Sequence, residues 1–188
     1  KKSPYTKDVK SVKEYESPLV NDWMRGSRPH RDPVPELLIK KPLLAQEPTP
    51  EENRRFSDLR RVGGIEVKTN DDVALIDKVV KYHVYGLTDS KWYQPDVEGH
   101  KRALDNMKKN REEIEKVLDA KGGINEKFAT IYKQSAMKYL TELLDNNLWV
   151  RANAMLLLAK VKDENAMRVF VAQIEDPKQH EGIKFLAI

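Results

Sequence analysis

The stretch that most constrains this chain is LLDNNLWVRANAMLLLAKV, residues 143–161. Apolar residues at helical spacing run from Phe128 to Leu144, a polar turn follows at 145–147, and a second apolar helix runs to Val161. A hairpin of two such helices leaves apolar side chains uncovered, so it needs a neighbouring element to cover them. The stretch therefore predicts an all-α fold in which helical hairpins lie against one another.

A second hairpin follows and repeats the first after a shift of 33 residues. Its turn carries Asp176 where the first turn carries Asp145, with a difference of two residues in turn length. Three positions in the second helix of each hairpin correspond: Val150 with Ile183, Arg151 with Lys184, and Ala154 with Ala187. A helical hairpin that recurs at this period is typical of solenoid proteins.

The segment D-N-N-L-W-V-R-A-N-A-M-L-L-L resembles the turn and second helix of a HEAT repeat. In that family the turn carries an Asp, the second helix begins with Val-Arg, and the acid and the base tend to ladder between neighbours. The resemblance covers about residues 126–188 and implies a HEAT-like solenoid. Lys184 departs from the usual Arg, and Gly182 loosens that helix start; a generic helical bundle is the alternative fold. The repeat-defining residues that the resemblance implies are Asp145, Val150, Arg151, Ala154, Asp176, Ile183 and Lys184.

Residues 1–48 predict a long extended arm, because eight of the ten prolines lie within residues 1–50 and proline excludes helix from the residue before it. Large apolar side chains stand between these prolines, which suits an arm that lies in grooves on another protein better than a free linker. Arginines in the same segment would form ion pairs with that partner. The predicted partner-binding residues are Trp23, Arg25, Arg28, Arg31, Leu37, Leu38, Leu43 and Leu44.

The positive charge of the chain is confined to its first third. Residues 1–69 carry 15 Lys and Arg against 11 Asp and Glu, whereas residues 70–188 carry 19 of each. The clusters RGSRPHR (25–31) and RRFSDLRR (54–61) could bind a nucleic-acid backbone. Acidic residues flank the first cluster (Asp22 and Asp32) and interrupt the second (Asp58), so an acidic protein surface is the favoured partner, and nucleic acid is the alternative.

Between the arm and the repeats, the sequence predicts two further segments. Residues 49–69 form a short helix and a linker, because Thr49-Pro50-Glu51-Glu52 is a helix start and Gly63-Gly64 a stop. Residues 70–124 form a helical region that is either a degenerate repeat or a cap. HEAT-like repeats then occupy 125–188.

We expect further chain in front of Lys1, which is not a Met, and beyond Ile188, where an apolar helical pattern is cut.

Residue patterns that would mark an active site are missing from the sequence. Cysteine is absent, which excludes disulfides and Cys-ligated metals from this chain. The four histidines are not at the spacing of a helical metal-binding pair. The glycine doublets are helix stops and are not followed by the Lys of a phosphate loop. Glu112, Glu113 and Glu115 are interleaved with basic residues on a solvent-exposed helix face. The sequence therefore predicts no catalytic, cofactor or metal site.

The function that these features predict is a non-catalytic scaffold. Its arm and repeat surface would tether or bridge subunits of a larger complex, such as a ring, tubule or filament, and the repeat faces would allow self-assembly. A nucleic-acid-associated HEAT-like protein is the alternative. No apolar run approaches the ~20 residues of a membrane span; a removed leader before Lys1 would imply export or an organelle lumen.

Overall fold

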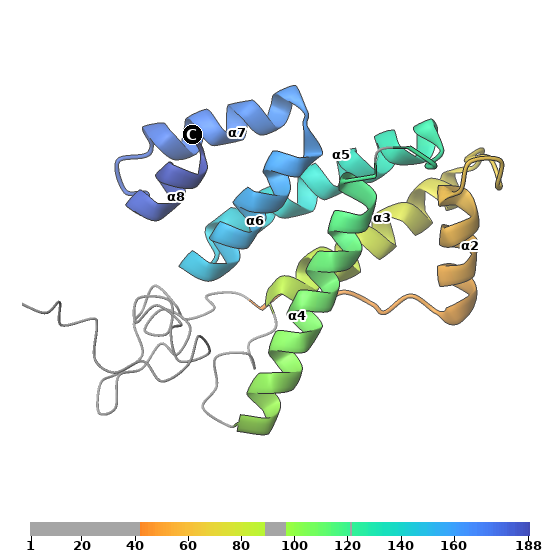
Figure 1. Cartoon of the computed structure of the whole chain (residues 1–188), viewed down its shortest axis with the longest axis horizontal. Helices are drawn as coiled ribbons and strands as arrows, with labels where there is room; N and C mark the ends of the chain where they lie inside the picture. The colour runs from red at the N-terminus through yellow and green to blue at the C-terminus, as the bar shows by residue number, and fades with distance from the viewer. Residues whose placement is uncertain (1–41, 89–96, 121) are drawn as a thin grey trace, which may run out of the picture.

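A computed structural model of the chain describes residues 42–88, 97–120 and 122–188 (Figure 1). Over these residues the fold is all-α, as predicted, and the one β-type contact among them is an isolated antiparallel bridge between Arg61 and Ile124. The predicted arm residues from Trp23 to Leu38 lie outside the described residues. The helices are α2 (Pro50–Arg60), α3 (Asn70–Tyr85), α4 (Val97–Leu118), α5 (Glu126–Glu142), α6 (Leu148–Val161), α7 (Glu164–Glu175) and α8 (Glu181–Leu186), with 3-10 turns η3 (Gly86–Thr88) and η5 (Leu143–Asp145).

Helix starts follow local sequence signals. Thr49 and Thr69 each begin a capping box, in which the Thr hydroxyl accepts from the third helical N–H and the acid at that position accepts from the Thr N–H. Asn125 and Asp163 cap α5 and α7 through their side chains. The helix start predicted at Thr49 is confirmed.

Helix α3 packs against α5, and α4 contacts both α3 and α6. Helix α6 packs against α5 and α8, and α7 contacts α5, α6 and α8. In Figure 1, α3, α5 and α7 all run from the right of the view to the left, and α4 and α6 run back upward. Contacts therefore link α3, α5 and α7 in series, and likewise α4, α6 and α8.

Helix α2 lies across the start of α3 and is held there by charged and aromatic contacts. Arg55 donates from Nε and Nη2 to Asp72 Oδ1 at 3.2 and 2.6 Å, and Lys78 Nζ lies 2.8 Å from both oxygens of Glu52. The Phe56 ring packs edge-on against Phe128 of α5 at 5.1 Å between centroids. These contacts make α2 a cover over the α3–α5 pair.

The turns before α6 and α8 have similar hydrogen bonds at the 33-residue shift, although the cap side chain accepts the N–H three residues on in the first turn and two residues on in the second. Asn147 caps α6 by accepting from Val150 N–H, and His180 caps α8 by accepting from Gly182 N–H. The residue before each cap, Asn146 or Gln179, is buried and accepts the N–H of the cap residue with its side-chain oxygen. The 33-residue shift aligns Asn146 with Gln179 and Asn147 with His180, so each position carries a polar side chain with a hydrogen-bond acceptor in both turns.

The described part of the predicted arm, residues 42–48, has no regular secondary structure. Leu43 is half-buried against the core of its own chain, and its N–H donates to Thr88 Oγ1 at 2.8 Å. Leu44 is 90% exposed. Of the two predicted anchors in this stretch, Leu43 therefore fixes the segment to its own helical body, and Leu44 is free to contact a partner.

Candidate protein-interaction surface

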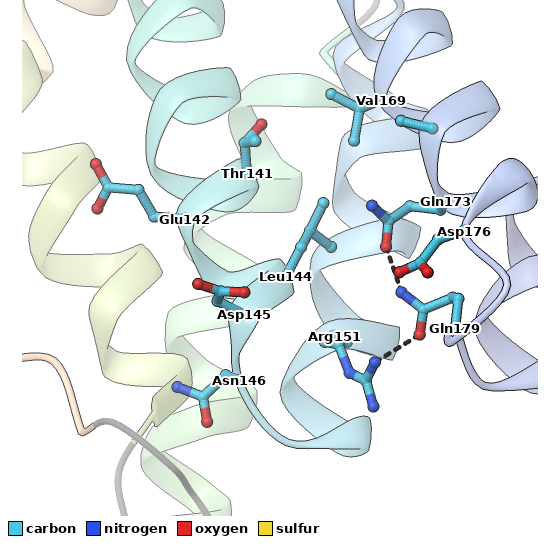
Figure 2. Close-up of a pocket in the computed structure, with 11 residues that line it drawn as sticks. Thr141, Glu142, Leu144, Asp145, Asn146, Arg151, Val169, Gln173, Asp176 and Gln179 are labelled. Atoms are coloured by element: carbon cyan, nitrogen blue, oxygen red, sulfur yellow. Dashed lines mark hydrogen bonds between the residues drawn. The ribbon is translucent and has the colours of Figure 1, made fainter.

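A groove of about 410 Å³ lies where the C-terminal ends of α5 and α7 meet the starts of α6 and α8. Figure 2 shows Leu144 and Asp145 on one wall, and Arg151, Gln173, Asp176 and Gln179 on the other. Two of the predicted repeat acids, Asp145 and Asp176, therefore border the same groove as Arg151. The structure brings these three residues to one place, although they belong to two different helix pairs.

Arg151 links the two helix pairs through amide side chains. Its Nη1 donates to Gln179 Oε1 at 2.5 Å, and Gln179 Nε2 donates to Gln173 Oε1 at 2.5 Å (Figure 2). Burial lowers the pKa of Arg151, and the nearby negative charge of Asp176 opposes that shift. The guanidinium thus fixes the α7–α8 turn to the start of α6. The hydrogen bonds from Arg151 through Gln179 to Gln173 form part of one wall of the groove.

The remaining repeat-defining residues divide between core and surface. Val150, Ala154 and Ile183 are fully buried. Lys184 lies 3.3 Å from Glu181, one turn away on its own helix. Asp145 is exposed and forms no ion pair within the described ranges. The buried positions thus pack the hairpins, whereas the acids remain at the surface.

A second hollow, of about 430 Å³, lies between α3 and α4. His83 Nδ1 lies 2.9 Å from Asn110 Oδ1, and burial lowers the pKa of His83. Asn110 in turn lies so close to Gly86 that a Cβ there would meet its amide nitrogen at 2.1 Å. His83 is therefore a packed histidine whose ring contacts Asn110 of α4.

Five of the exposed large apolar side chains lie on α7, on α8 and at Ile188, which follows α8. Along α7, Met167, Val171 and Ile174 are 61%, 48% and 40% exposed, and on the α8 side Phe185 and Ile188 are 77% and 96% exposed. Apolar residues are rarely left in such groups on a free surface. Met167, Val171 and Ile174 follow one another at spacings of four and three residues, which places them in one stripe along α7.

Two arginines of the second basic cluster, residues 54–61, form contacts within the chain itself. Arg55 is paired with Asp72, and Arg60 Nη2 donates to the carbonyl of Lys116 at 3.4 Å. Arg54 and Arg61 are exposed. The arginines of 54–61 therefore do not present one continuous basic surface.

Across the described residues, no group of three or more His, Asp or Glu is arranged to hold a metal ion, and none of the helices there is both long and apolar enough to cross a membrane. No protein-family model, curated protein or solved structure matches this chain.

Proposed function

We propose that the chain is a non-catalytic assembly subunit that binds other protein subunits. In this proposal it is a short stack of HEAT-like hairpins, which uses the apolar α7–α8 surface and the N-terminal segment 1–48. The observation that carries the proposal is the set of exposed apolar residues on α7, on α8 and directly after α8: Met167, Val171, Ile174, Phe185 and Ile188.

The order of helix contacts supports the stacked-hairpin part of the proposal. Helices α3, α5 and α7 contact one another in series, as do α4, α6 and α8. The shared pattern at Asn146–Asn147 and Gln179–His180 adds a second, independent similarity at the same 33-residue shift. In a stack of this kind each hairpin is buried against the next, and a hairpin face without a neighbour exposes apolar side chains.

The chemistry of the α7–α8 surface favours a protein partner over nucleic acid. Met and Phe are enriched at protein interfaces, and the burial of apolar side chains stabilises such an interface. A phosphate backbone would instead require a cluster of basic side chains. Arg55 and Arg60 of the second basic cluster are engaged within the fold.

The test is affinity purification of the full chain from its native source, with quantitative mass spectrometry. Val171→Asp combined with Phe185→Asp places charges on the α7–α8 surface, and we expect it to lose the stoichiometric partner of the wild-type chain. Ile65→Asp is the matched control, because Ile65 is an exposed apolar residue in the loop between α2 and α3. Equal recovery of all partners by the double variant and the control would refute the proposal for this surface.

Deletion of residues 1–41 tests the contribution of the N-terminal segment separately. This deletion keeps Leu43 and the buried Pro48, so that the contact of residues 42–48 with the helical body is retained. We expect the truncated chain to fold and to incorporate poorly into the partner complex. Normal incorporation would remove the segment from the proposal.

A further inference from the structure

The exposed stripe on α7 has the spacing of a seam between two helices. Met167, Val171 and Ile174 are separated by four and then three residues, which is the alternation that lines one side of a coiled-coil helix. All three are at least 40% exposed in the described chain. The stripe therefore has the form of a surface that packs against another helix.

Two charged residues flank this seam on one edge. Arg168 directly follows Met167 and Glu175 directly follows Ile174, so the two lie seven residues, or about two helical turns, apart on the same edge of the helix. Both are exposed, and neither takes part in an ion pair in the part of the chain that the structure describes. Their charges are available to a partner.

The pattern is complementary to itself when it is reversed. An antiparallel copy of α7 sets the same edges of the two helices against each other, with Val171 near the two-fold axis. The pair Met167–Arg168 of one copy then faces the pair Ile174–Glu175 of the other. Met167 and Ile174 then pack against each other in the seam, and Arg168 and Glu175 lie opposite each other at its edge. The two-fold symmetry produces each of these contacts twice.

We infer that α7 docks in antiparallel orientation on α7 of a second copy of this chain, with Arg168 of each copy paired to Glu175 of the other. This inference rests on the proposed function, since it names one partner of the proposed interaction surface. Charge complementarity selects the occupant: a helix of unrelated sequence would match the apolar stripe, but only a second copy is certain to carry the matching pair of charges in reverse order.

Sedimentation velocity of the purified full chain, from micromolar to millimolar concentration, measures the self-association. We expect a monomer–dimer equilibrium in the wild-type chain. Arg168→Glu and Glu175→Arg each place like charges together, so each single change should raise the dissociation constant at least about tenfold. The double variant Arg168→Glu/Glu175→Arg restores opposite charges and should return the dissociation constant close to the wild-type value.

Arg54→Glu is the matched control for a charge reversal, because Arg54 is exposed on α2 and should leave the dimer unchanged. Circular dichroism of every variant establishes that the helices remain folded. A wild-type chain that stays monomeric over the whole range overturns the inference. So does a dimer that neither single reversal weakens, or one that the double variant fails to restore.

The two proposals can fail separately. Sedimentation of the purified chain reports only self-association, whereas the affinity purification from the native source reports partners of other sequence. Two differently tagged copies of the chain, expressed together, distinguish recovery of a second copy from recovery of another protein. A monomeric chain that still loses its partner on Val171→Asp/Phe185→Asp would reject the inference and keep the proposed function.

Discussion

The hydroxyl of Tyr139 on α5 donates a 2.5 Å hydrogen bond to Asp77 Oδ2 on α3, across the most extensive helix contact of the fold. The other oxygen of Asp77 accepts from Ser135 Oγ at 2.9 Å. Tyr139 also packs edge-on against Tyr85 at 5.5 Å between centroids, and the Tyr85 hydroxyl donates to Glu142 Oε2. One carboxylate therefore fixes the register of α3 on α5 through two residues of the same helix.

Tyr139→Phe keeps the ring and removes the donor to Asp77. Because a hydrogen bond to a charged group contributes more than a neutral one, we expect the free energy of unfolding to fall by about 1.5–3 kcal/mol. Urea denaturation followed by circular dichroism measures the loss. Ser57→Ala is the control: its hydroxyl bonds the Asn53 carbonyl on an exposed surface, and it should change the free energy by no more than about 0.5 kcal/mol.

Asp72→Asn should change the dependence of stability on pH. The N–H of Thr69, with Arg55 and the N–H of Lys68, holds the pKa of Asp72 far below its ordinary value of about 4. Because the folded pKa is the lower one, this stabilisation is fully present above the unfolded pKa and is lost as the pH falls below it. Asp72→Asn should therefore cost on the order of 2 kcal/mol at neutral pH. Its stability should also fall less than the wild type's below about pH 5.

Unfolding measured at a series of pH values tests the Asp72 prediction. Asp71→Asn is the matched control, since Asp71 precedes it on α3 and is exposed. A parallel fall of stability with acid in the wild-type and Asp72→Asn chains would contradict the assignment of the acid sensitivity to Asp72.

Gly86→Ala should disturb the contact between α3 and α4. The backbone of Gly86 is right-handed helical and would accept Ala, but the new Cβ would meet the Asn110 amide nitrogen at 2.1 Å. Asn110 must then move away from His83, so the pKa of His83, which burial already lowers and the Asn110 bond partly raises, should fall further. Titration of the His83 ring by NMR measures the change. Gly86→Ala should also lower the free energy of unfolding. Adding Asn110→Ala removes the clash and should recover most of that loss. A double variant as unstable as Gly86→Ala would contradict this explanation.

Arg151→Lys should loosen the α7–α8 turn. A lysine keeps the positive charge but lacks the planar group that donates to Gln179. We expect amides of residues 176–186 to exchange hydrogen roughly 5–10 times faster, the equivalent of about 1–1.5 kcal/mol, with α3 unchanged. Hydrogen exchange with mass spectrometry makes this comparison. Equal protection in both chains would mean that the Arg151–Gln179–Gln173 bonds do not hold the turn.

The sequence by itself determined the positions of the helices in the described chain. Thr49, Thr69, Asn125 and Asp163 cap helices because their side chains reach N–H groups two or three residues away, and such contacts do not depend on the rest of the fold. The long helix α4, from Val97 to Leu118, lies within the region 70–124 that was predicted to be helical. The turn acids and the apolar periodicity likewise needed only neighbouring residues, so the all-α fold followed from them.

Only the tertiary structure decided which side chains meet across the fold and which remain uncovered. Asp77 and Tyr139 are 62 positions apart, and Leu43 reaches Thr88 over 45, so their pairing depends on how whole helices pack. The apolar pattern of α7 was visible in the sequence, but a periodicity cannot separate a buried stripe from an adjacent exposed one. Burial of Ala166 and exposure of Met167 depend on where α5, α6 and α8 lie, which is a property of the packed chain and not of the helix alone.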